Sequence, residues 1–320
     1  MTGAKTGIMV CGHGSRDAEA IREFEGLTAG LKSAHPDLDI EAGYLEFARP
    51  MIREGLEKLA ARGAARILAL PGMLFAASHV KNDLPWEINS FAAAYPGLEL
   101  RFGRELAIEP KLLKAAAERI EAAERLAARR IARSESLLLV VGRGTADPDA
   151  NSNIAKLARM LWEGMGFGWA ETAFSGVAHP LVEPALRRAA LMGFSRTVVF
   201  PYFLFTGVLV KRIYAAVDRV AADHPAIDFV KATYLRDHPL VLDCFADRIA
   251  ELADGEPAMN CRLCAYRTQI IGYEEKAGAP QEAHHHHVRG IGIDPLHHHH
   301  HDGDHPHAHR TNGHGRNGSS

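Results

Sequence analysis

Three side chains in the first half of the chain are suited to bind a divalent metal ion. His13 stands in a Gly-His-Gly-Ser-Arg stretch, Glu46 in Tyr-Leu-Glu-Phe-Ala-Arg-Pro, and His79 in Ser-His-Val-Lys-Asn-Asp. Two imidazoles and one carboxylate suit borderline ions such as Co²⁺, Ni²⁺, Fe²⁺ and Zn²⁺. All three groups can also accept protons near neutral pH, so the same set would serve a reaction that releases protons.

The chain contains two copies of one pattern. Gly142-Arg143-Gly144-Thr145 follows Gly12-His13-Gly14-Ser15 by 130 residues. After one deletion the interval becomes 129, as between Pro110 and Pro239. A register held over this length predicts a duplicated fold.

The two copies differ at the three candidate metal ligands. In the second copy these positions are occupied by Arg143 for His13, Gly176 for Glu46 and Leu209 for His79. Each histidine alone has a plainer interpretation, as a turn residue or a helix start, because short motifs often match by chance. Their joint loss from the second copy favours one shared site in the first copy, with the second copy shaping it.

Short apolar runs alternate with amphipathic stretches, which predicts alternating strands and helices. In the first copy we expect strands at 7–12, 40–47, 65–70 and 98–103, with helices from residues 17, 50, about 80 and 110. In the second copy we expect strands at 137–141, 171–177, 197–200 and 227–233, each followed by a helix. Pro50 and Pro110 suit the first turn of a helix, where the missing N–H costs nothing.

This alternation predicts two parallel sheets, each flanked by helices. Ligands of such α/β sheets bind at the carboxyl ends of the strands. His13, Glu46 and His79 all lie at or just after an expected strand end. We therefore expect the three side chains to meet at one edge of the first sheet.

Length and composition indicate two domains and a tail. The chain has 320 residues, 47% of them hydrophobic, and we expect domains at 1–133 and 134–255 and a tail at 256–320. A net charge of −2 without a dense basic run outside the tail argues against nucleic-acid binding. The apolar runs are too short for a signal peptide or a membrane span, and four cysteines make no disulfide framework, so we expect a cytoplasmic protein.

The tail is rich in histidine, with runs at 284–287 and 297–301 and interleaved aspartates. It has few aliphatic residues, so we expect it to be disordered without metal and to bind metal ions through its imidazoles. An affinity tag would normally be a single unbroken run. A leftover linker is the alternative interpretation.

The glycines around His13 imitate a phosphate-binding loop without its lysine, and Asp17 stands where a dinucleotide-binding motif has its third glycine. We therefore expect no nucleotide cofactor.

Taken together, these motifs resemble those of the class II tetrapyrrole chelatases, in their long, duplicated form. The resemblance covers residues 7 to about 253, and Met259-x-Cys261-x-x-Cys264 with the histidine runs extends it into the tail. It implies two tandem chelatase-like (flavodoxin-like) domains and ATP-independent insertion of Co²⁺ into sirohydrochlorin for cobalamin biosynthesis. By resemblance, His13 and His79 are metal ligands and proton acceptors, and Glu46 assists. Insertion of iron or nickel into the same or a related macrocycle is the alternative.

Sirohydrochlorin is rich in carboxylates, so a cleft between the two halves should supply cations. The candidates near strand ends or helix starts are Arg16, Arg49, Lys81, Arg143, Lys211 and Arg212. Arg143 stands in the place of His13, which suggests that a metal ligand was exchanged for a carboxylate clamp.

The pair Cys261 and Cys264 is consistent with a 4Fe–4S cluster, which the resemblance favours. Such clusters usually need four thiolates, so Cys244, a non-cysteine ligand or a second subunit would have to complete it, and a homodimer stays open. Zinc or a redox-active dithiol is the alternative.

Two other functions compete with an enzyme of this kind. A metal-storage or delivery protein could work through the histidine-rich tail. A phosphate-ester enzyme could use His13 as nucleophile, but the arginines that would hold a phosphoryl group are missing around it. Retention of His13, Glu46 and His79 together favours the chelatase, because storage would need only the tail.

Overall fold

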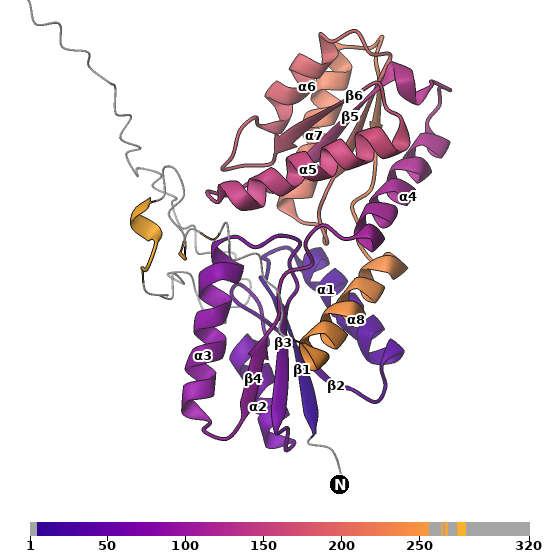
Figure 1. The fold of residues 1–320 in the computed structure, drawn as a ribbon. Coiled ribbons are helices and arrows are strands. Elements are labelled where there is room, and N and C mark those ends of the chain that lie inside the picture. The colour runs from indigo at the N-terminus through magenta and orange to yellow at the C-terminus, as the bar shows by residue number, and fades with distance from the viewer. Residues whose placement is uncertain (1–4, 256–263, 265, 268–273, 280–320) are drawn as a thin grey trace, which may run out of the picture.

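The computed structural model describes residues 5–255, 264, 266–267 and 274–279 (Figure 1). It contains two parallel four-stranded sheets, one from each copy of the repeated pattern. The strand orders are β2-β1-β3-β4 and β6-β5-β7-β8, which are equivalent in the two repeats. The predicted α/β class and the duplication are therefore confirmed.

The first repeat consists of β1 (Thr6–Gly12), α1 (Ala18–Ala34), β2 (Asp39–Tyr44), α2 (Ile52–Ala61), β3 (Arg66–Pro71), the π-helical turn η1 (His79–Asp83), α3 (Leu84–Ala94), β4 (Glu99–Phe102) and α4 (Pro110–Leu126). The second consists of the short η2 (Arg133–Glu135), β5 (Ser136–Gly142), α5 (Pro148–Met165), β6 (Trp169–Phe174), α6 (Val182–Ala190), β7 (Arg196–Pro201), α7 (Val208–Asp223), β8 (Asp228–Lys231) and α8 (Pro239–Asp254). A further turn, η4 (Glu274–Lys276), lies in the tail. No helix within the described residues is long and apolar enough to cross a membrane.

The two repeats share details of backbone conformation at the predicted interval. Gly14 has φ +98° and Gly144 has φ +84°, and a Cβ on either would lie under 2 Å from a carbonyl oxygen, that of Glu46 or Gly176. Glycine is required at both positions because a side chain has no room there and L residues rarely adopt this φ. The central strands β1 and β5 are apolar along almost their whole length, as expected for strands covered on both faces.

The prediction for Pro50 is wrong. Helix α2 begins at Ile52 with Met51 as its N-cap residue, so Pro50 precedes the helix, and its peptide bond with Arg49 is cis. Strand β2 ends at Tyr44, three residues earlier than predicted, because the chain turns away to form the loop that carries Glu46. Pro110 is the first residue of α4, as predicted.

The last helix of each repeat packs on the sheet of the other repeat. Helix α8 contacts β3 and α1, whereas α4 contacts β7, β8 and α5 (Figure 1). The buried Arg248 of α8 donates hydrogen bonds to the carbonyl oxygens of Glu105 and Leu106, in the loop after β4. Each sheet is therefore covered by helices from both repeats.

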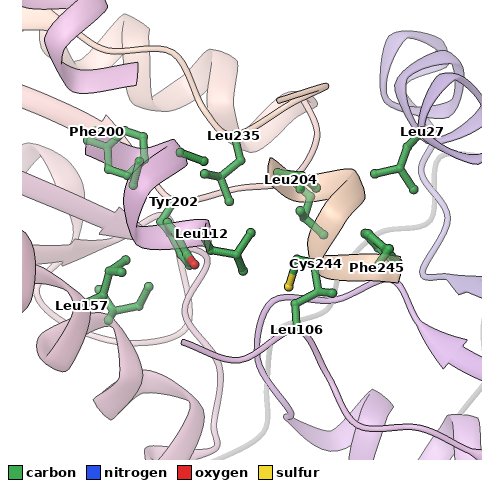
Figure 2. Close-up of a cluster of buried hydrophobic side chains, with 14 of the residues drawn as sticks. Leu27, Leu106, Leu112, Leu157, Phe200, Tyr202, Leu204, Leu235, Cys244 and Phe245 are labelled. Atoms are coloured by element: carbon green, nitrogen blue, oxygen red, sulfur yellow. The ribbon is translucent and has the colours of Figure 1, made fainter. Parts of the chain in front are cut away.

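This exchange gives the repeats a shared apolar core. Figure 2 shows Leu27 of α1 near Phe245 of α8, and Leu112 of α4 in the same cluster as Phe200 of β7. The outer faces of the two sheets have separate cores, one in each repeat. The shared core fixes how the carboxyl ends of the two sheets face each other.

Candidate functional site

The three candidate metal ligands meet at the carboxyl edge of the first sheet. His13 directly follows β1, Glu46 lies in the loop after β2, and His79 begins η1 after β3. The Nε2 atom of His13 lies 3.0 Å from Nε2 of His79 and 3.2 Å from Oε1 of Glu46. One potential ligand atom from each residue lies within 4.8 Å of the other two.

The hydrogen bonds of the two rings fix their tautomers. Nδ1 of His13 lies 3.0 Å from the carbonyl oxygen of Gly14, and Nδ1 of His79 lies 2.6 Å from Oδ2 of Asp83. Carbonyl and carboxylate oxygens only accept hydrogen bonds, so each Nδ1 carries the hydrogen and each Nε2 presents a lone pair. The two lone pairs and the Glu46 carboxylate converge, and this arrangement suits a cation.

The surroundings favour the neutral form of His13. Burial, followed by the positive charges that His79 and Arg143 can carry, lowers the pKa of His13 to about 3. An imidazole must be deprotonated at the ligating nitrogen to bind a metal ion. At neutral pH His13 is therefore in the form that binds metal.

Asp83 is a site residue that sequence reasoning missed. Asp83 is 1% exposed, and its carboxylate also accepts a hydrogen bond of 2.9 Å from the Asn82 amide. Carboxylates that accept the second N–H of a ligating histidine orient the ring and raise its donor strength. The i,i+4 spacing of His79 and Asp83 was the signal that could have identified it.

His13 and His79 line a cavity of about 460 Å³ between the two repeats. This volume lies within the range of small-molecule sites. Both repeats line it, largely with apolar side chains that include Phe47, Phe75, Phe203 and Phe205. Such walls suit the faces of a flat, conjugated ligand.

Two of the six cations predicted to bind substrate line this cavity. Arg143 lines it from the second repeat, near enough for its charge to act on His13, and Arg16 follows His13 by three residues. The Arg16 guanidinium lies 5.0 Å from the centre of the Phe47 ring, which also faces the cavity. Both arginines are exposed, so their charges are accessible to an anionic ligand.

The structure places the other four cations elsewhere. Lys81 is buried against two aspartates of the second repeat, and Lys211 binds acidic residues of the first. Arg49 lies 3.5 Å from Glu54 on an exposed surface, and Arg212 is exposed on α7, outside the cavity lining. The expectation that these four bind carboxylates of the substrate has no support in this geometry.

The described cysteines do not supply a cluster. Cys244 is fully buried beside Phe245 and Leu106 (Figure 2), and burial raises the pKa of its thiol to about 11. Among the described residues Cys244 belongs to no group of potential metal ligands, so the structure gives no support to it as a third cluster ligand. Cys264 is buried, whereas Cys261 and the histidine runs lie outside the described residues.

The fold and the site together define a class of protein: a duplicated α/β protein with potential ligands for one metal ion at the cavity between its repeats. The CbiX family model matches residues 7–123 and 137–252, once in each repeat. The chain therefore belongs to the CbiX family.

Similar proteins carry the names of chelatases for two metals. The sirohydrochlorin cobaltochelatase of Priestia megaterium is 34% identical over 265 residues, or 82% of this chain and 85% of that protein. The sirohydrochlorin ferrochelatase of Bacillus subtilis strain 168 is 28% identical over 250 residues, or 78% of this chain and 92% of that protein. The structure of SirB from Bacillus subtilis with Fe³⁺ is similar, with a TM-score of 0.69 and 28% identity, and the match covers 78% of this chain and 96% of SirB.

Proposed function

We propose that this protein is a sirohydrochlorin chelatase that inserts Co²⁺ for cobalamin biosynthesis, without ATP. One observation supports this proposal above all. The lone pairs of His13 and His79 converge with the Glu46 carboxylate at the edge of an apolar cavity. The names of the relatives supply the substrate class. The cytoplasm is the proposed location, where unpaired thiols such as that of Cys11 stay reduced.

Metal insertion exchanges two pyrrole N–H protons for one divalent ion, which must also lose its water. His13, neutral at pH 7, and His79 hold the incoming ion, assisted by Glu46, with ligands that can be exchanged for pyrrole nitrogens. As the ion passes to the pyrrole nitrogens, its former ligands are freed and accept the two pyrrole protons, while the Asp83 carboxylate at Nδ1 keeps the His79 ring oriented. The protein therefore supplies ligands and bases, and the exchange needs no energy from nucleotide hydrolysis.

The macrocycle is held between the repeats. Its faces pack against the aromatic walls, and its carboxylates bind Arg143 and Arg16, the two cations in the cavity lining among the described residues. Charge-assisted hydrogen bonds from arginine are strong and directional. Arg143 lines the same cavity as His13 and His79, so its bond to a carboxylate fixes the macrocycle relative to the metal ligands.

Fe²⁺ or Ni²⁺ is the alternative substrate metal, because the same ligand set binds all three ions. A spectrophotometric assay with sirohydrochlorin and each ion in turn tests the proposal. We expect Co²⁺ to give the highest kcat/KM, with the same rate in the presence and absence of ATP. A rate no higher than that of metal and sirohydrochlorin alone, for all three ions, would overturn the proposed function.

We also propose that Cys261 and Cys264 bind a 4Fe–4S cluster or zinc, and that the histidine-rich tail collects metal ions. A cluster would require further ligands, such as those of a second subunit. No step of insertion is assigned to this centre, because metal exchange moves no electrons.

A further inference from the structure

Lys81 is a buried cation in the turn that carries His79. Its Nζ atom lies 2.7 Å from Oδ2 of Asp147 and 3.0 Å from Oδ2 of Asp149, and its side chain is only 2% exposed. Both aspartates belong to the amino-terminal end of α5, in the second repeat. The turn η1 continues into α3 of its own repeat and is tied by Lys81 to the second repeat.

Lys211 is the counterpart of Lys81 in the second repeat. Its Nζ atom lies 2.7 Å from Oδ2 of Asp17 and 3.1 Å from Oε2 of Glu19, at the start of α1. These partners precede Asp147 and Asp149 by the repeat interval of 130 residues. The second contact differs from the first because Lys211 is 53% exposed, and solvent weakens such a pair.

The two lysines also differ in what their turns carry. Lys81 lies between His79 and Asp83, which are joined by the 2.6 Å hydrogen bond. Lys211 lies two residues after Leu209, which cannot bind a metal ion. Any displacement of η1 would move the His79 ring and its Asp83 partner together, away from His13.

We propose that Lys81 is a positioning residue: through Asp147 and Asp149, the second repeat holds His79 in place for metal binding in the first. The inference rests on the proposed metal-binding role of His13 and His79. A buried ion pair adds little net stability, but it can specify one arrangement of the elements that it joins. The second repeat has no metal ligands at the equivalent positions, but it would contribute to the metal site by holding the turn that carries His79.

The charges around Lys81 determine which variants are informative. Glu105 lies close enough for the positive charge of Lys81 to favour its ionised form. Its buried Oε2 atom has no hydrogen-bond partner among the described residues. Removing Lys81 alone would leave the partly buried Asp147 and Asp149 carboxylates without their cation, which destabilises a folded protein. The triple variant Lys81→Met/Asp147→Asn/Asp149→Asn removes the pair without leaving its charges, and asparagine preserves the N-cap of α5.

The test is a titration of the full-length protein with Co²⁺ alone, in which binding is measured by the visible d–d absorption of the ion. Each protein is compared with the same protein carrying His13→Ala, so that Co²⁺ bound by tail histidines cancels. In Lys81→Met and in the triple variant, we expect the affinity of the His13-dependent site for Co²⁺ to fall about tenfold or more. The shape of its absorption band should also change. In Lys211→Met, the matched control, the affinity should change by less than about twofold.

Three results would overturn the inference. Unchanged Co²⁺ affinity and band shape in folded Lys81 variants, with only a lower melting temperature, would make Lys81 a purely structural residue. Equal losses of Co²⁺ affinity in the Lys81→Met and Lys211→Met proteins would show that contacts between the repeats act on the cavity in general, and not on His79 in particular. A parent protein without any His13-dependent signal would refute the proposed metal site itself, and the inference with it.

Discussion

The Nε2 atoms of His13 and His79 face each other at 3.0 Å, and each ring is fixed from its other nitrogen by an oxygen acceptor. The acceptor for His13 is a backbone carbonyl, whereas that for His79 is the buried Asp83 carboxylate. This difference separates their chemistry. His13 is held as a neutral ligand, whereas the His79 ring is oriented by a carboxylate, which raises the donor strength of a ligating histidine.

Asp83→Asn should weaken the metal site without emptying it. The amide is close in size to the carboxylate but has no charge, so the His79 ring loses donor strength and its fixed tautomer. We expect KM for Co²⁺ to rise about 10-fold to 100-fold, measured as the rate of insertion against metal concentration. Glu57→Gln, on an exposed face of α2, is the control. An unchanged KM in Asp83→Asn would show that the hydrogen bond has no part in metal binding.

Arg143→Ala should impair substrate binding more than turnover. Loss of a charge-assisted hydrogen bond to a carboxylate is expected to raise KM for sirohydrochlorin about 10-fold to 100-fold. Steady-state kinetics at saturating Co²⁺ separate KM from kcat. Arg219→Ala, which removes an exposed ion pair with Glu183, is the matched control. If kcat falls as severely as in His13→Ala while KM is unchanged, the two repeats are catalytically equivalent and their asymmetry is refuted.

Deletion of residues 281–320 should raise the Co²⁺ concentration needed for half-maximal rate and leave the maximal rate nearly unchanged. Clustered imidazoles on a tether increase the local supply of ion but do not contact the reacting atoms. Insertion rates of the truncated and full-length proteins over a range of Co²⁺ concentrations provide the measurement. A lower maximal rate at saturating Co²⁺ would instead assign the tail to the catalytic machinery.

The Cys261→Ser/Cys264→Ser variant should lose a visible chromophore and keep cobalt insertion. The parent protein, purified without oxygen, should be brown if the pair binds a cluster. Metal analysis and absorption spectra distinguish this from zinc, which would give a colourless protein. If the double variant no longer inserts cobalt, the separation of the tail from the chemistry is wrong.

The repeated fold and the meeting of the three ligands could be predicted from the sequence. Strand and helix periods are local, and the rule that parallel strands share a carboxyl edge then places His13, Glu46 and His79 together. The register of 130 residues also identified Gly144 as the counterpart of Gly14, and both positions require glycine. These features depend on short-range pattern and on sheet geometry alone.

The contacts between the repeats could not be predicted in the same way. The amphipathic pattern of α4 or α8 indicates a buried face but not which sheet covers it, so the exchange of the two helices has no local signal. Lys81 and Lys211 follow strand ends and were expected to face a substrate. Which way a long side chain turns depends on acidic partners that the fold brings from the other repeat.

The central claim is that His13, Glu46 and His79 form the single site at which the metal is inserted. The most direct test is the rate of Co²⁺ insertion into sirohydrochlorin by His13→Ala and His79→Ala, with circular dichroism to verify that the fold is intact. Each substitution should lower kcat/KM by about 100-fold or more, because ligand and base are both lost. A folded His13→Ala/His79→Ala double variant that inserts cobalt at the parent rate would contradict the account.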